Sequence, residues 1–220
     1  NNLGKTTQIE LIQKRCEDEG IKVWTQKYPK YDLEPTGPLI FEAIKGGNPK
    51  NLYPGEIQAL TARNRFDFQS VVEDILCGRR AEGAAAIVAE MYTGTGIAFG
   101  IGEGVNKDYL LALNEDLLVP TVSILLDGKR FKHAVEKGHR FEEDDEKTEK
   151  IRQIHLELAR EHGWIIVNAT RRFQRCTNRF GELSEIICNF KKEAEKASFL
   201  YNGLYARNAQ NGYKEGTSRA

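Results

Sequence analysis

Short continuous apolar runs that alternate with helical patterns constrain the fold of this 220-residue chain more than any other feature. Three such runs are AAAIVAE at 84–90, TVSILLD at 121–127 and WIIVN at 164–168, and a shorter β-branched segment lies at 21–25. Continuous runs of this kind are typical of parallel strands buried on both faces. Their alternation with helices favours βαβ units. We therefore predict a three-layer α/β fold, in which helices flank both faces of a parallel sheet.

Apolar residues at helical spacing, with prolines and glycines at the ends, predict the remaining elements. The expected helices cover 5–19, 38–45, 54–77, 144–162 and 178–197. Proline opens the second and third helices and glycine follows the first three, which is the usual asymmetry of helix ends. Residues 1–197 are then expected to form one domain. Residues 198–220 lack periodicity and are expected to be a disordered tail.

Composition excludes several classes of protein. Lys plus Arg and Asp plus Glu number 32 each, so no overall field attracts the chain to nucleic acid or to an anionic membrane. No apolar stretch reaches the length of a membrane span, and the first residues are polar. The four cysteines form no CxxC pair and indicate free thiols in a reducing compartment. We expect a cytoplasmic protein without a membrane or nucleic-acid partner.

Gly4-Lys5-Thr6-Thr7 stands at the start of the first predicted helix. A glycine-rich turn at a helix N-terminus directs backbone N–H groups at phosphate, the lysine meets the outer phosphates, and the first hydroxyl binds Mg²⁺. A chance exposed turn is the alternative, but the helix and the β-type segment that follow fit the motif. We predict that these four residues bind ATP, with Thr6 as a Mg²⁺ ligand.

Two predicted strands end in a carboxylate. Glu90 ends the 84–90 run and Asp127 ends the 121–127 run. A Mg²⁺-bound nucleotide needs a carboxylate at the carboxyl end of a strand near the phosphate-binding turn. Glu90 is the preferred metal ligand, and a solvated acid at a strand end is the alternative for both. We expect Lys5 and Glu90 to meet at one edge of the sheet.

A longer series of motifs makes the interpretation more specific. GKTTQ is followed by YPK in a proline-broken loop, ARNRF on the long helix, EMYTGTGIAF and GHRFE. In order and spacing, this series resembles the thymidylate kinase family. The resemblance implies a P-loop NTPase fold and the transfer of the ATP γ-phosphoryl group to dTMP, with Mg²⁺, to give dTDP. It also implies a homodimer.

The resemblance bears on the start of the chain as well. In the family the strand that leads into the phosphate-binding turn is central in the sheet, and we expect it to precede residue 1. Residues 1–220 by themselves are then expected to fold poorly and to bind ATP weakly.

The resemblance also assigns residues to the acceptor site. Lys30 matches a loop arginine that holds the acceptor phosphate, although a lysine lacks the bidentate fork. Arg65 matches a helix arginine that reads the thymine edge, and Thr61 stands where the family often has a stacking phenylalanine. The alternative for Arg65 is a side chain that merely lies along its own helix. The small residues at 93–96 match a flexible segment that contacts the nucleoside, and the alternative for them is a plain glycine turn. Further nucleoside contacts are implied for Tyr92, Thr95, Gly96 and Phe99.

The triplet Glu90-Met91-Tyr92 is the largest departure from the family pattern. The family has Asp-Arg-Tyr or Asp-Arg-His there, and its arginine bridges the donor and acceptor phosphates. Either another cation stabilises transition-state charge in its place or the enzyme is slow. The basic stretch at 128–143 matches the family's mobile lid, and in it Arg140 is expected to stabilise the phosphates and Phe141 to contact the nucleoside. A solvated charged loop is the alternative.

Three functions remain open on the sequence. The leading one is a dTMP kinase that works by in-line phosphoryl transfer with Lys5, Glu90 and Arg140 as catalytic residues. The second keeps the reaction but takes another pyrimidine nucleotide or a deoxynucleoside as acceptor, since Lys30 and Thr61 are unusual. The third is a nucleotide-binding homologue with weak catalysis, which Met91 suggests.

Overall fold

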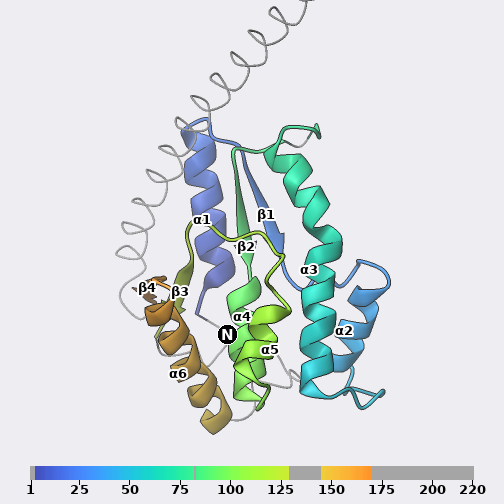
Figure 1. Cartoon of the computed structure of the whole chain (residues 1–220). Helices are drawn as coiled ribbons and strands as arrows, with labels where there is room; N and C mark the ends of the chain where they lie inside the picture. Colours follow the sequence, from blue (N-terminus) through green and yellow to red (C-terminus); the bar gives the residue numbers. More distant parts are fainter. Residues whose placement is uncertain (1–2, 82, 129–144, 170–220) are drawn as a thin grey trace, which may run out of the picture.

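A computed structural model describes residues 3–81, 83–128 and 145–169 (Figure 1). The elements in chain order are α1 (Lys5–Asp18), β1 (Val23–Lys27), α2 (Thr36–Ile44), α3 (Pro54–Leu76), β2 (Ala86–Glu90), α4 (Thr93–Gly102), α5 (Lys107–Ala112), β3 (Ile124–Asp127), α6 (Asp145–Glu161) and β4 (Ile165–Asn168). Every expected element within the described residues is present, and each strand begins one to three residues later than its apolar run. The expected helix at 178–197 and the tail at 198–220 lie outside the described residues.

The four strands form two parallel pairs. β1 pairs with β2, so that Lys27 lies opposite Glu90, and β3 pairs with β4, so that Asp127 lies opposite Asn168. The expectation of one continuous sheet is not met among the described residues, because no hydrogen-bonded ladder joins β2 to β3. A strand between these two would join the pairs. The expectation that such a strand leads into Gly4 stays a prediction.

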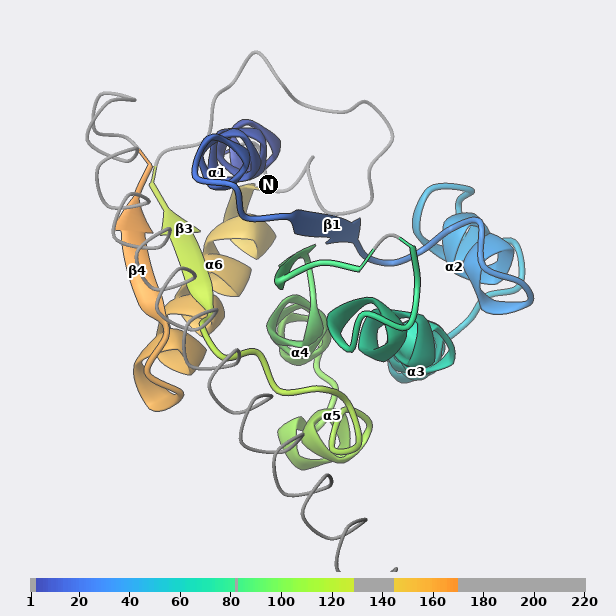
Figure 2. The ribbon, with the colours of Figure 1, turned by 90° about the horizontal axis from the view of Figure 1, so that it is seen from above.

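Helices cover both faces of the β1–β2 pair. Figure 2 shows α1 on one face and α3 with α4 on the other. On the α1 face, Ile12 and Cys16 pack with Val23 of β1 and with Val88 of β2. On the opposite face, Phe68 and Val72 of α3 pack with partly buried strand residues that include Trp24 and Ile87. Side chains alternate along each strand, so this packing decides which strand residues face α1.

The TGTG sequence forms the first turn of helix α4, where the sequence predicts a flexible segment or a glycine turn. Glycine weakens an isolated helix, but here its lack of a side chain allows close packing. A Cβ on Gly94 would clash with the Trp164 ring, and a Cβ on Gly100 would lie 2.7 Å from both methyl groups of Leu110. Tertiary packing thus outweighs the low helix propensity of this segment.

None of the helices in the described part of the chain combines the length and the apolar character that a membrane crossing requires.

Candidate functional site

The start of α1 has the features of an anion site. Gly4 is the N-cap residue, its φ is 77°, and no side chain caps the first turn. Thr6 and Thr7 are exposed, and the first turn contains no acidic residue. The backbone N–H groups of a first helical turn have no partner within the helix, and the helix dipole favours negative charge beside them. The geometry suits a bound phosphate.

Glu90 ends β2 at the same end of the molecule as the start of α1 (Figure 1). The Glu90 side chain is buried, and its Oε2 lies 3.9 Å from the Nζ of Lys27. Ala86 and Val88 of β2 pack toward α1, and Glu90 continues their alternation. Its carboxylate therefore lies on the sheet face that α1 covers, together with Lys27, its partner in the register.

Met91 follows Glu90 with a φ of 60°, in the left-handed region that favours glycine. A side chain in this region strains the backbone, and such strain is often stored next to a functional site. The backbone therefore turns sharply at Met91. The Met91 thioether carries no charge, so this residue supplies no cation at the end of β2.

Arg65 is a buried cation without an ion-pair partner among the described residues. Arg65 is 4% exposed, its Nη2 donates to the Tyr92 carbonyl at 3.3 Å, and its buried Nε has no hydrogen-bond partner. Burial lowers the pKa of Arg65 to about 10, so it stays charged at neutral pH. Burial, with Tyr92 nearby, raises the pKa of Tyr28 to about 12, and burial also raises the pKa of Tyr92. The two tyrosines next to Arg65 are therefore neutral phenols. A buried guanidinium with an unused donor suits a polar ligand.

Lys30 is held in place by its surroundings. Its Nζ lies 2.9 Å from Asp32 and 4.9 Å from the centre of the Phe68 ring. Asn64, which is fully buried, accepts a hydrogen bond from the Lys30 amide at 2.7 Å and donates to the Lys30 carbonyl at 3.0 Å. It also donates to the Thr36 hydroxyl at 2.9 Å. Asn64 therefore fixes the loop to α3, although only its position inside ARNRF could have drawn attention to it.

Thr61 is buried, and its hydroxyl lies 2.9 Å from the Gln58 carbonyl and 3.3 Å from Gln58 Oε1. The position that the resemblance assigns to a stacking ring is therefore occupied by a polar pair. Gln58 is a second residue that the sequence did not single out.

Thr95, Gly96 and Phe99 lie on α4. Gly96 faces Arg65 of α3, since a Cβ there would lie 3.0 Å from Arg65 Nη2. The Phe99 ring meets the His155 ring of α6 edge to face, with centroids 5.9 Å apart. Burial lowers the pKa of His155, and the nearby positive charge of Lys5 lowers it further. The start of α1 therefore lies near the place where the Phe99 ring of α4 meets this imidazole of α6.

Asp127, the second candidate carboxylate, is already engaged. Its two oxygens lie 2.6 and 2.9 Å from Nε and Nη2 of Arg152 on α6. This bidentate pair holds the pKa of Asp127 below its usual range. Asp127 thus anchors α6 to the end of β3, which leaves Glu90 as the better candidate for a metal. The expected lid at 128–143, with Arg140 and Phe141, lies outside the described residues apart from Gly128.

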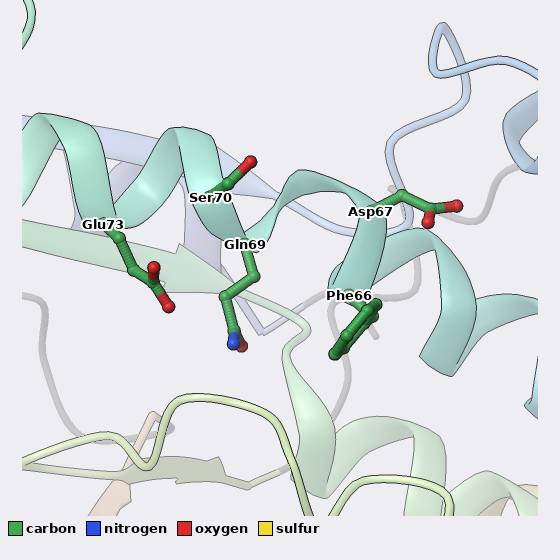
Figure 3. Close-up of a pocket in the computed structure, with 5 residues that line it drawn as sticks. All are labelled: Phe66, Asp67, Gln69, Ser70 and Glu73. Carbon is green, nitrogen blue, oxygen red and sulfur yellow. The ribbon is translucent and has the colours of Figure 1, made fainter.

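A shallow depression lies on a different face of α3. Figure 3 shows the residues that line it, and its volume is about 390 Å³. One of them, Gln69, holds the loop between α5 and β3, because it donates to the Asp116 carbonyl at 3.2 Å and accepts from the Leu118 amide at 2.8 Å. The lining residues are Phe66, Asp67, Gln69, Ser70 and Glu73. None of them is among the predicted site residues.

Comparison with known proteins bears directly on this site. The sequence profile of the family described as thymidylate kinase matches residues 1–179. The chain belongs to the thymidylate kinase family. Membership makes it a phosphotransferase. The match spans every candidate site residue, including Arg140 and Phe141.

Individual relatives agree with the profile. A thymidylate kinase from Dictyostelium discoideum is 24% identical over 201 residues, which cover 87% of this chain and 83% of the relative. One from Plasmodium falciparum is 22% identical over 202 residues, or 90% of this chain and 91% of the relative. The solved structure of thymidylate kinase from Candida albicans aligns with a TM-score of 0.66 at 22% identity, over 86% of this chain and 89% of that one. The likeness shows an α/β fold of the P-loop NTPase class.

Proposed function

We propose that this thymidylate kinase homologue transfers the γ-phosphoryl group of ATP to dTMP, with Mg²⁺, in an in-line reaction. The observation that carries the proposal is that α1 begins, and β2 ends, at the same end of the molecule (Figure 1), while α3 presents a buried guanidinium beside the first turn of α4. Phosphoryl transfer needs two nucleotides held end to end and their charge stabilised, with no covalent step on the protein.

The chain's own residues fit ATP and Mg²⁺. The left-handed Gly4 turn and the uncapped first turn of α1 offer backbone donors to phosphate, and Lys5 and Thr7 flank the exposed hydroxyl of Thr6. Thr6 and Glu90 are the residues that would hold Mg²⁺, whose chemistry is to neutralise phosphate charge. Among the described residues no three His, Cys, Asp or Glu side chains cluster.

The acceptor nucleotide would bind where Arg65 of α3 meets the first turn of α4. Arg65 would donate to the base, and Gly96, which has no side chain, would let the base approach. Lys30 would meet the acceptor phosphate from a loop that Asn64 holds in place. Tyr92, Thr95 and Phe99 would surround the nucleoside. The lid residues Arg140 and Phe141 would complete the site and exclude water.

A coupled assay of ADP release tests the proposal. The full chain with Mg²⁺ and ATP is expected to turn over dTMP faster than other monophosphates, among them dUMP, dCMP and dGMP. Failure of dTMP to stimulate ADP release would refute the proposed function. Faster turnover of another pyrimidine nucleotide would favour the second hypothesis, and the Candida albicans relative is itself described as having broad substrate specificity.

Met91 favours one further candidate, a nucleotide-binding homologue with weak catalysis. Its thioether replaces the bridging arginine of the family pattern, at a strained backbone position beside Glu90. If that missing charge limits the reaction, Met91→Arg raises kcat severalfold or more, since a cation at this place stabilises transition-state charge. The Kd for ATP is expected to stay within about twofold. A brisk wild-type rate that Met91→Arg does not improve would exclude this candidate.

A further inference from the structure

Gln58 is a buried polar residue on α3 that packing alone does not explain. It is 8% exposed, and its Oε1 accepts a hydrogen bond from the Thr61 hydroxyl at 3.3 Å. In the part of the chain that the structure describes, its side chain makes no other hydrogen bond. Helix faces that pack on other helices are normally apolar, and a polar side chain is buried at a cost in free energy unless its interactions offset that cost.

Gln58 and Arg65 approach the same glycine. A Cβ added to Gly96 would lie 3.1 Å from Gln58 Oε1 and 3.0 Å from Arg65 Nη2. The two residues are seven positions apart, about two turns, so they share one face of α3. The Nε of Arg65 also lacks a partner. Two buried polar side chains, one of which has an unused donor, therefore converge on Gly96 of α4, where no side chain intervenes.

We propose that Gln58 is a specificity-determining residue that reads the acceptor base together with Arg65. This inference rests on the proposed dTMP kinase function. A guanidinium only donates hydrogen bonds, whereas a carboxamide both donates and accepts. The reading edge of a 4-oxo pyrimidine carries the acceptor O4 beside the donor N3–H. The pair therefore complements thymine or uracil, while cytosine would turn its 4-amino donor toward Arg65.

Thr61 supports this role. Its hydroxyl lies 2.9 Å from the Gln58 backbone carbonyl as well as 3.3 Å from the carboxamide oxygen, so it fixes the position of the carboxamide. A large ring at position 61 would lack this hydroxyl. The polar pair therefore stands where the family often places an aromatic contact, and it supplies hydrogen bonding in place of stacking.

The test is the base preference of variants of the full chain, measured as kcat/KM for dTMP, dUMP and dCMP. Gln58→Leu is expected to lower kcat/KM for dTMP by about 10- to 100-fold, mainly through KM, because it leaves polar edges of the base unpaired. Gln58→Glu has nearly the same shape but only accepts hydrogen bonds, so it can still pair with the thymine N3–H but opposes the N3 lone pair of cytosine. It is therefore expected to shift the dCMP-to-dTMP ratio at least about tenfold toward dTMP. The KM for ATP should change little in either.

Gln69→Leu is the matched control, because Gln69 lies on the same helix and its hydrogen bonds hold a loop. It should lower the Tm and leave base preference unchanged. If the wild type turns over dTMP but Gln58→Glu keeps the wild-type ratio, this inference is wrong even if Gln58→Leu does not fold. A wild type without dTMP-dependent turnover overturns the proposed function, and this inference with it.

Discussion

At the scale of single residues, the candidate acceptor site depends on buried polar side chains that hold one another in place. Arg65 is charged, enclosed and only partly paired, whereas Asn64, its neighbour in the chain, uses both ends of its amide on a distant loop. A protein keeps such groups buried only when their interactions repay the cost of leaving water. The ARNRF segment thus combines a residue that stabilises the fold with one that is available to a ligand.

Asn64→Ala is expected to lower the free energy of unfolding by about 2–4 kcal/mol, because it leaves the Lys30 amide and carbonyl without partners. Urea unfolding measures the loss. Arg63→Ala on the same helix is the control. The Arg63 side chain is exposed, and its only ion-pair and cation–π partners among the described residues are its helix neighbours Asp67 and Phe66, so its loss should cost less than about 0.5 kcal/mol. Equal losses in the two variants would show that Asn64 does not clamp the loop.

At the scale of elements, the glycines of α4 set how closely its neighbours approach. Gly100→Ala would place a methyl group 2.7 Å from the Leu110 side chain of α5. We expect it to destabilise the protein by about 1–3 kcal/mol through overpacking. Gly55→Ala on α3 is the control, because its new Cβ would meet only ordinary contacts at 3.7 Å or more. That variant should be neutral or gain up to about 1 kcal/mol of helix propensity. Thermal unfolding that ranks the two variants in the opposite order would contradict the packing.

The attachment of α6 to β3 has a pH dependence. Arg152 holds the pKa of Asp127 below its ordinary value, so the folded state keeps this carboxylate charged where the unfolded state binds a proton. The contribution is complete above about pH 4–5 and is lost as the pH falls through the lowered pKa. The stability difference between the wild type and Asp127→Asn should therefore shrink below about pH 4. A difference that stays constant from pH 7 to pH 3 would show that the ion pair does not stabilise the fold.

Several elements could be predicted because their signals are local. Gly4, the helix after it and the apolar runs that end at Glu90 and Asp127 are read from consecutive residues. Helix α4 could not be predicted from TGTG, because the helix is stabilised by packing against Trp164 and Leu110, which lie outside this segment of the sequence. The role of Asp127 depends on an arginine 25 positions away. Composition and spacing carry no information about such contacts.

At the scale of the whole molecule, the described chain brings three kinds of group toward one end. An uncapped helix start, a buried strand-end carboxylate and a buried guanidinium come from α1, β2 and α3 respectively. The order of these elements follows from parallel strands whose carboxyl ends share an edge, where such folds bind ligands. The two strand pairs and the three groups together support a site that spans a donor and an acceptor nucleotide.

The most direct test is a crystal structure of the full chain with a bisubstrate analogue in which adenosine and thymidine are joined through a polyphosphate. We predict that the phosphates lie at the start of α1 within reach of Lys5 and Glu90, and that the thymine lies against Arg65 and Gly96. A thymine bound away from α3, or phosphates away from the start of α1, would contradict it.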